Sequence, residues 1–316
     1  MKTAQNSVAA GADLESLAYS LMLAAVKDHK EVVELLLGTE GVHPDSKGLD
    51  GRTPLSHAAE YGHEAVSKLL LTTPGVNPDS KDSVGRTPLS YATENVNTAV
   101  FKLLLAMGGV DPECKDHDDR TPLWYAARGG PVEVVRLLLA TEGVDPDSED
   151  SNGVTPLSMA ASTGRGAMVK QLLGTDGVDP DSRDFNEQTP LSRAAQRGQL
   201  EIAELLIATE GVNPDSRDSN EQTPLSHAAR FGKLPVVELL IATEGVNPDS
   251  RDNNGRSPLW YAAEYDHGAV FQLLLSTEGV DPDPKDSYGR PPPSFNLYRQ
   301  IRWNSLNFPS SIKARS

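Results

Sequence analysis

The sequence predicts an all-α protein built from stacked pairs of short helices, and the main reason is an internal repeat. The seven residues Thr223-Pro224-Leu225-Ser226-His227-Ala228-Ala229 belong to a pattern that returns every 34 residues. A fixed period of about 20 to 50 residues is the signature of stacked supersecondary units rather than of one folded-back core. The opening Thr-Pro pair stands at Thr53, Thr87, Thr121, Thr155, Thr189 and Thr223, continues as Ser257-Pro258, and is worn to Pro291-Pro292.

Each copy of the pattern predicts the start of a helix. The hydroxyl of Thr53 can accept an early amide hydrogen, and Pro54 has the fixed φ and the missing donor that suit the first helical position. Leu55, Ala58 and Ala59 then fall at i, i+3 and i+4, on one face of the helix. Two small residues on this face let neighbouring helices approach closely.

A second helix follows each first one. Gly62 permits a left-handed turn, and Val66, Leu69 and Leu70 lie on one face of a helix that runs to about Leu71. Each helix has about nine residues, fewer than the roughly 12 to 15 at which an isolated helix becomes even marginal in water, so neighbouring units must supply the stability. The polar link over residues 72–86 predicts an extended loop with a hairpin-like tip at its end.

These units divide the chain into three segments. We expect a flexible lead over residues 1–18, with a short amphipathic run near Leu14, and a C-terminal segment over residues 291–316. For that segment three interpretations remain, namely a degenerate cap, a disordered basic tail and the end of a truncated or mis-spliced longer array, and a tail with partial docking is favoured. Between them lie eight predicted repeats: 19–52, 53–86, 87–120, 121–154, 155–188, 189–222, 223–256 and 257–290.

Two of the repeats depart from the pattern. The first, over residues 19–52, lacks the Thr-Pro start, as expected of an N-terminal cap that has only one neighbour. In the third, Thr93 replaces the second Ala and Val96 stands where most other repeats have Gly. A β-branched residue at positive φ is strained, so either this turn is remodelled or it stores strain, and we expect residues 87–120 to open first.

Composition excludes several classes of function. The net charge of −16 argues against nucleic acid, because a phosphate backbone would be repelled. Cys114 is the only cysteine, so no intrachain disulfide can form and an intracellular protein is indicated. Residues 1–8 contain no apolar signal core, and no run of 18 apolar residues occurs. We therefore expect a cytoplasmic or nuclear protein that makes no contact with a membrane.

The sequence contains no set of residues that indicates catalysis. No phosphate-cradling loop, metal-ligand pair or nucleophile elbow is present. His117 with Cys114, Asp116 and Asp118 comes nearest to a metal site, but a solvated loop tip explains it better. The recurring Asp-Pro-Asp segments are interpreted as packed acidic turns rather than calcium loops. We predict a protein that is not an enzyme and that has no metal and no cofactor.

The repeated motif resembles that of the ankyrin repeat family. In this family T-P-L-H-x-A opens the first of two helices at a period near 33 residues, and Thr-Pro-Leu-Ser-x-Ala-Ala matches it over residues 19–290. The Thr-Glu-Gly-Val link, which carries one extra residue, is similar to that of filamentous-fungal ankyrin arrays. The resemblance implies an all-α solenoid of helix-turn-helix units joined by β-hairpin-like loops. A second departure is that the family His is replaced by Ser56, Ser90, Trp124, Ser158, Ser192, Ser226 or Trp260.

The resemblance also implies where a partner binds, since the corresponding positions of the family line a concave surface. His57, Glu60 and Tyr61 lie on a different face from Leu55 and the two Ala, so their stripe is expected to face outward. Arg and aromatic residues, which are enriched at interface hot spots, gather there. The candidate protein-binding residues are Tyr125, Arg128, Phe185, Arg193, Arg197, His227, Arg230, Phe231, Tyr261 and Tyr265.

These features predict a non-catalytic protein-protein interaction module, an adaptor or scaffold that is monomeric by itself. A basic and aromatic patch within an acidic chain suits an acidic or phosphorylated protein partner. A transcriptional co-regulator would be one form of this function. The alternative hypothesis is a ligand-sensing repeat fragment of a larger, receptor-like protein that contains an NTPase, as in some fungal arrays with a similar link.

Overall fold

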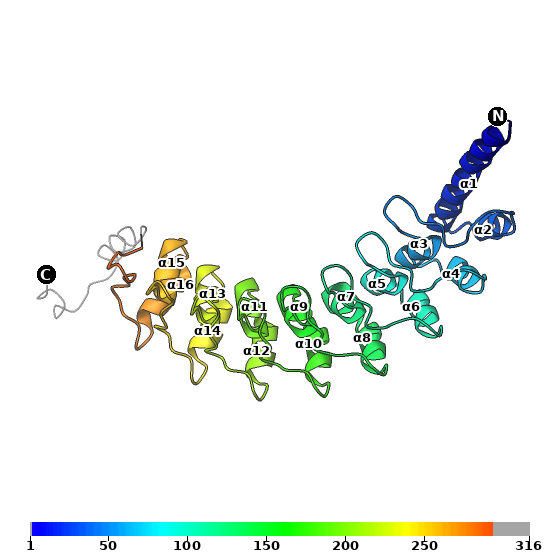
Figure 1. The fold of residues 1–316 in the computed structure, drawn as a ribbon. Coiled ribbons are helices and arrows are strands. Elements are labelled where there is room, and N and C mark those ends of the chain that lie inside the picture. Colours follow the sequence, from blue (N-terminus) through cyan, green and yellow to red (C-terminus); the bar gives the residue numbers. More distant parts are fainter. Residues whose placement is uncertain (1, 293–316) are drawn as a thin grey trace, which may run out of the picture. The chain divides into compact units, whose positions relative to one another are not determined.

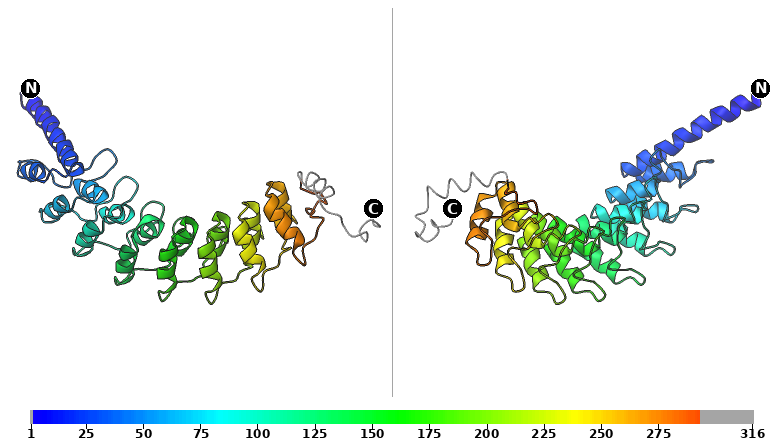
Figure 2. Two further views of the ribbon diagram at one scale, coloured as in Figure 1. Left: turned by 180° about the vertical axis from the view of Figure 1, so that it is seen from behind. Right: turned by 60° about the vertical axis from the view of Figure 1, so that its left-hand side comes forward.

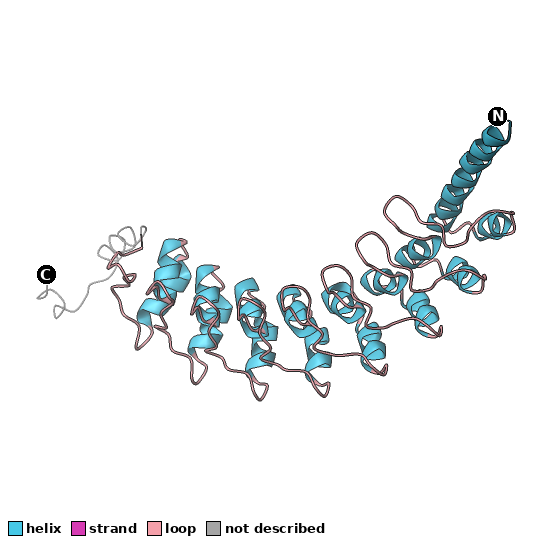
Figure 3. Ribbon diagram, in the orientation of Figure 1, coloured by secondary structure: helices cyan, strands magenta, loops and turns pink. Residues whose placement is uncertain are grey.

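The computed structural model describes the chain over residues 2–292, and side chains from residue 14 onward. These residues form sixteen helices and no strand, in pairs that follow the 34-residue spacing, so the predicted all-α repeat fold is confirmed (Figures 1 and 3). The helices are α1 (Lys2–Val26), α2 (Lys30–Leu37), α3 (Pro54–Tyr61), α4 (Glu64–Leu71), α5 (Pro88–Glu94), α6 (Thr98–Leu105), α7 (Pro122–Gly129), α8 (Val132–Leu139), α9 (Pro156–Thr163), α10 (Gly166–Leu173), α11 (Pro190–Arg197), α12 (Leu200–Ile207), α13 (Pro224–Arg230), α14 (Leu234–Ile241), α15 (Pro258–Glu264) and α16 (Gly268–Ser276).

The chain divides into two compact units. Unit 1 comprises Met1–Ala160 and Ala167–Val178, and unit 2 comprises Ala161–Gly166 and Asp179–Ser316. Within unit 1 the first helices α1, α3, α5 and α7 contact one another in order, and α2, α4, α6 and α8 form a second layer. Within unit 2 the same two layers consist of α11, α13 and α15 and of α12, α14 and α16, as both views of Figure 2 show.

The first helices begin as the Thr-Pro motif predicts. In α3 the Thr53 hydroxyl accepts the backbone N–H of Ser56 at 3.2 Å, and the Ser56 hydroxyl faces the backbone N–H of Thr53 in return. Leu55 and the two Ala on its face are fully buried between the neighbouring first helices. Helices of seven or eight residues are therefore held by packing against equivalent helices rather than by their own length.

The N-terminal segment differs from the expected flexible lead. Helix α1 runs without a break from Lys2 to Val26, so residues 2–18 continue the first helix of the first repeat. The sequence explains this, since the segment has no Pro, is rich in Ala and Leu, and has no Thr-Pro pair to start a new helix at residue 19. The interpretations of residues 291–316 lie almost entirely outside the described part of the chain.

The loop tips are tight turns that join successive repeats. In the second repeat Asp82 N–H donates to Arg86 O at 3.0 Å and Gly85 N–H donates to Asp82 O at 3.1 Å, which closes the tip. Ser83 N–H then donates to Asp50 O in the preceding tip at 2.9 Å. The same backbone bond links Ser219 to Asn186 within unit 2.

Val96 retains the left-handed turn of the other repeats. Its φ is 65°, so the turn is not remodelled and the strain of a β-branched residue is stored there. At the equivalent Gly62 a side chain would clash, because its Cβ atom would lie 2.4 Å from the side-chain oxygen of Asn97. The side-chain nitrogen of Asn97 donates a hydrogen bond to Ala59 O in the preceding repeat. Pro131 takes the place of Asn97 in the following repeat and carries no side-chain amide. The Val96 side chain therefore has room, and Val96 is 54% exposed.

Relief of this strain is expected to stabilise the third repeat. We predict that Val96→Gly raises the free energy of unfolding by about 1 kcal/mol, because the relief of backbone strain outweighs the entropy cost of glycine. Urea denaturation measures the change. In the wild type, the amides of residues 87–120 should exchange hydrogen faster than those of residues 189–256. In the variant, the amides of residues 87–120 should exchange more slowly than they do in the wild type. Val84→Gly, at a similarly exposed position without positive φ, is the matched control and should destabilise slightly. Equal effects of the two substitutions would contradict stored strain.

The links between repeats hold half-buried carboxylates. Burial is the largest cause that raises the pKa of Asp45, Asp79, Asp181 and Asp215 at equivalent positions, and Asp79 accepts the backbone N–H of Asp111 from the next repeat at 3.4 Å. Glu113 takes this place in the third repeat, where burial, and secondarily the charge of Asp145, raises its pKa to about 7.

Stability should therefore fall as these carboxylates ionise. The folded pKa of Glu113 lies above its ordinary value of 4.5, so the folded protein holds a proton that the unfolded chain releases between these two pH values. We expect Glu113→Gln to raise the free energy of unfolding at pH 8 by about 1 kcal/mol, a value reduced by solvent screening, and to have a smaller effect at pH 4. Urea denaturation at both pH values tests this. The exposed control Glu142→Gln should alter neither, and a pH-independent effect of Glu113→Gln would count against the raised pKa.

Candidate functional site

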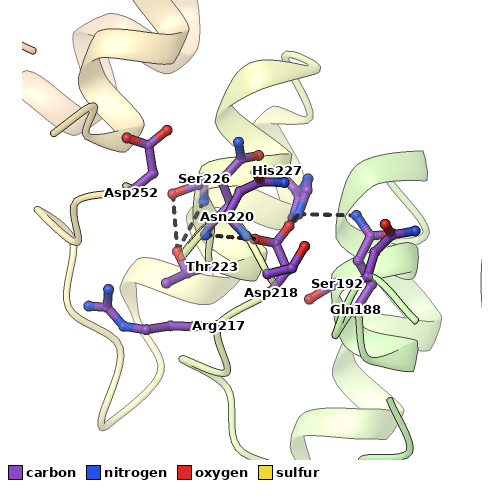
Figure 4. A network of polar contacts seen from close by, with 12 residues as sticks. Gln188, Ser192, Arg217, Asp218, Asn220, Thr223, Ser226, His227 and Asp252 are labelled. Carbon is purple, nitrogen blue, oxygen red and sulfur yellow. Dashed lines mark hydrogen bonds and ion pairs between the residues drawn. The ribbon is translucent and has the colours of Figure 1, made fainter. Parts of the chain in front are cut away.

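A buried aspartate organises the loop tip of seven repeats. One oxygen of Asp218 accepts the backbone N–H groups of Asn220 at 2.9 Å and Gln222 at 2.8 Å, which fixes the turn (Figure 4). This pattern of i+2 and i+4 donors recurs at every equivalent residue. The tip aspartates are Asp82, Asp116, Asp150, Asp184, Asp218, Asp252 and Asp286.

In five of these tips the second oxygen of the aspartate binds a side chain from the next first helix, nine residues later. The hydroxyl groups of Tyr91, Tyr125 and Tyr261 donate to their tip aspartates at 2.6, 2.5 and 2.5 Å. Nε2 of His227 contacts Asp218 Oδ2 at 2.9 Å, and Arg193 forms an ion pair with Asp184. The side chain at this position is therefore a clamp between helix and tip.

This clamp corrects the expectation that the whole predicted stripe faces outward. Tyr125, His227 and Tyr261 are only 2, 3 and 2% exposed, because the loop tip folds over them. Burial raises the pKa of Tyr125 to about 12, and burial and the hydrogen bond to Asp252 raise that of Tyr261. Burial opposes ionisation of Asp218, but the hydrogen bonds from His227 and two backbone amides outweigh it and lower the pKa.

The His227 and Asp218 pair does not form part of a catalytic triad. Nε2 of His227 is held by Asp218, with the amide nitrogen of Gln188 at 3.5 Å from the same ring nitrogen (Figure 4). The other ring nitrogen, Nδ1, is buried and has no hydrogen-bond partner within the described chain. Neither ring nitrogen is hydrogen-bonded to a hydroxyl or thiol of a described residue, and the contact with Asp218 orients the tip.

In unit 1 the exposed charges of the stripe pair with one another. Arg128 contacts Glu94 at 3.3 Å, and Arg86 forms a second ion pair with the same carboxylate. The Arg86 guanidinium also stacks between the rings of Tyr91 and Tyr125, at 4.1 and 4.3 Å from their centroids. Arg128 is exposed as predicted, but its charge is already matched within the unit.

In unit 2 the corresponding cations remain unmatched. Arg197 ends α11 and is exposed, and neither it nor Arg230 forms an ion pair with any described residue. The Arg230 guanidinium lies 5.7 Å from the Phe231 ring and 5.5 Å from the Tyr265 ring. These rings cap α13 and α15 and are 42 and 47% exposed. We call Arg197, Arg230, Phe231 and Tyr265 the arginine–aromatic ridge.

The remaining predicted residues lie beside this ridge or are used elsewhere. Phe185 stands on the loop tip before α11 and is 71% exposed, but no ring contact with the ridge is present among the described residues. Arg193 is partly buried by its ion pair with Asp184. The tip aspartates were not predicted from the sequence, although an Asp stands five residues before every helix start from Thr87 onward.

Among the described residues, no group of three or more His, Cys, Asp or Glu side chains is arranged to hold a metal ion. None of the helices in this part of the chain combines the length and the apolar character needed to cross a bilayer.

Comparison with known proteins identifies one family. The family model for ankyrin repeats (3 copies) matches residues 21–116, 96–184 and 191–286, which together make up more than half of the chain. A search of the curated proteins gave no match.

The clamp should contribute to stability and not to recognition. We predict that Tyr261→Phe lowers the free energy of unfolding by about 1 to 2 kcal/mol, since it leaves Asp252 and Gln222 without their shared hydroxyl. The ring, which contacts Arg230, is retained. Thermal and urea denaturation measure the loss. Tyr265→Phe is the matched control, because no described residue hydrogen-bonds to its hydroxyl, and should be neutral. An unchanged free energy of unfolding in Tyr261→Phe would show that the clamp does not stabilise the fold.

Proposed function

The chain belongs to the ankyrin repeat family, whose repeats are generally modules for protein-protein interaction and typically non-catalytic, and from this premise we propose a non-catalytic adaptor or scaffold. We assign its partner to the arginine–aromatic ridge, within the array of residues 19–290. The observation that carries the proposal is the pair of unmatched cations, Arg197 and Arg230, beside the exposed rings of Phe231 and Tyr265.

The chemistry of the ridge favours an acidic or phosphorylated protein segment. A guanidinium group can bind a carboxylate or a phosphate with two parallel hydrogen bonds, which are stronger than bonds between neutral groups. The neighbouring rings offer apolar area at low entropy cost, as at interface hot spots. Since the protein carries a net charge of −16, the two unmatched arginines are a local exception to its general repulsion of anions. A role as transcriptional co-regulator would follow from the identity of the partner.

Reversal of both charges should abolish capture of the partner. We expect the double variant Arg197→Glu/Arg230→Glu to lose bound proteins in a pull-down from cell extract while its melting temperature falls only slightly. Neither residue has an ion pair to lose, and only the contacts of Arg230 with the neighbouring rings are removed. The matched control is Lys68→Glu/Arg136→Glu, which makes the same charge change at exposed positions of α4 and α8. Retention of every partner by the ridge variant, or equal loss in the control, would show that the ridge is not the binding face.

A further inference from the structure

Glu264, on the helix that carries Tyr265, lacks the arginine that its equivalents have. In the second repeat Glu60 pairs with Arg52, eight residues earlier, at 2.8 Å. The residue eight before Glu264 is Arg256, but its guanidinium stacks on the Trp260 ring, 4.5 Å from the centroid. One carboxylate oxygen of Glu264 is buried and has no hydrogen-bond partner in the described part of the chain. The Arg256 guanidinium thus contacts Trp260 and does not form the ion pair that would neutralise Glu264.

Three unmatched charges consequently lie on three successive repeats of unit 2. Arg230 and Glu264 occupy strictly equivalent positions, and Arg197 is one residue beyond the equivalent position in the preceding repeat. From the two arginines of the ridge to Glu264, which stands beside Tyr265 at its end, the signs are plus, plus and minus. Because packed helices lie about 8 to 10 Å apart, the backbone positions that carry consecutive charges are separated by roughly that distance.

This spacing fits an extended chain. A β-strand advances about 3.3 Å per residue and a polyproline II helix about 3.1 Å, so three residues span roughly 9 to 10 Å. Polyproline II also returns every third side chain to the same face. We propose that the ridge binds an extended protein segment with two acidic residues and one basic residue at every third position, its acids on Arg197 and Arg230 and its base on Glu264. This inference rests on the proposed function and specifies the partner.

A helical partner fits the same ridge less well. Seven residues of an α-helix rise about 10.5 Å, so a heptad spacing would also match the step between repeats. A bound helix, however, buries a continuous apolar stripe in a groove. The ridge alternates charged groups with the partly exposed rings of Phe231 and Tyr265, and the two intervening residues of an extended segment can reach these rings.

Designed peptides test the register on the full-length protein. The matched peptide carries aspartates at its first and fourth positions and a lysine at its seventh, in a proline and alanine host. One control has the same composition with the aspartates adjacent, and another places the three charges seven residues apart in an alanine-rich helix. Fluorescence anisotropy at low salt should show the matched peptide binding at least fivefold more tightly than either control. Equal affinities, tighter binding of the helix, or no binding of the matched peptide at 1 mM would overturn the proposal.

A charge swap tests the role of Glu264. Glu264→Lys should weaken the matched peptide at least fivefold and favour a peptide with glutamate in place of its lysine. Glu238→Lys, an equal change at an exposed position of α14, is the control and should leave both affinities unchanged. Equal effects of the two variants would remove Glu264 from the site. If Arg197→Glu/Arg230→Glu still loses its partners while peptide register has no effect, only this inference fails and the proposed function stands.

Discussion

The structure depends on the buried carboxylate at each loop tip. One oxygen of Asp218 fixes the turn through two backbone amides, and the other holds His227 on the first helix. The orientation of the tip is therefore set by a charge-assisted contact between the end of one repeat and the first helix of the next. The loop tip of the first repeat has no such carboxylate. Gly48 stands at the equivalent position, and the residue nine positions later, His57, contacts Glu60 at 3.9 Å instead.

The clamp explains which parts of the site the sequence predicted. Local signals placed the helices correctly, because Thr53 and Pro54 act on the adjacent turn and the Ala pairs act through their spacing. Exposure of Tyr125, His227 and Tyr261 could not be inferred in this way, because it depends on a loop tip that folds back across nine residues. The lead before Tyr19 was missed for the opposite reason, since a helix continues wherever nothing in the sequence stops it.

The two units use the same scaffold with different charge balances. In unit 1 a glutamate such as Glu94 satisfies two arginines, and the stripe is neutralised by its own side chains. In unit 2 Gln196 stands at the equivalent position, and Arg197 and Arg230 have no acidic partner. The charged side chains without an ion pair inside the unit are thus the ones available to bind a partner. Pairing patterns depend on geometry between repeats, so a count of charged residues along the stripe does not reveal them.

The bonds between successive loop tips have a consequence for the history of the chain. Ser83 to Asp50 and Ser219 to Asn186 are joined by main-chain hydrogen bonds, and basic side chains such as Lys81 and Arg183 add bonds to backbone carbonyl groups of the next repeat. The acceptors in these bonds are backbone atoms, which every repeat provides. Residues 189–222 and 223–256, which share long identical runs, can therefore have arisen by unequal crossover without any need to redesign the joint. The number of repeats can therefore change in whole 34-residue steps, while the surface residues that bind a partner change independently.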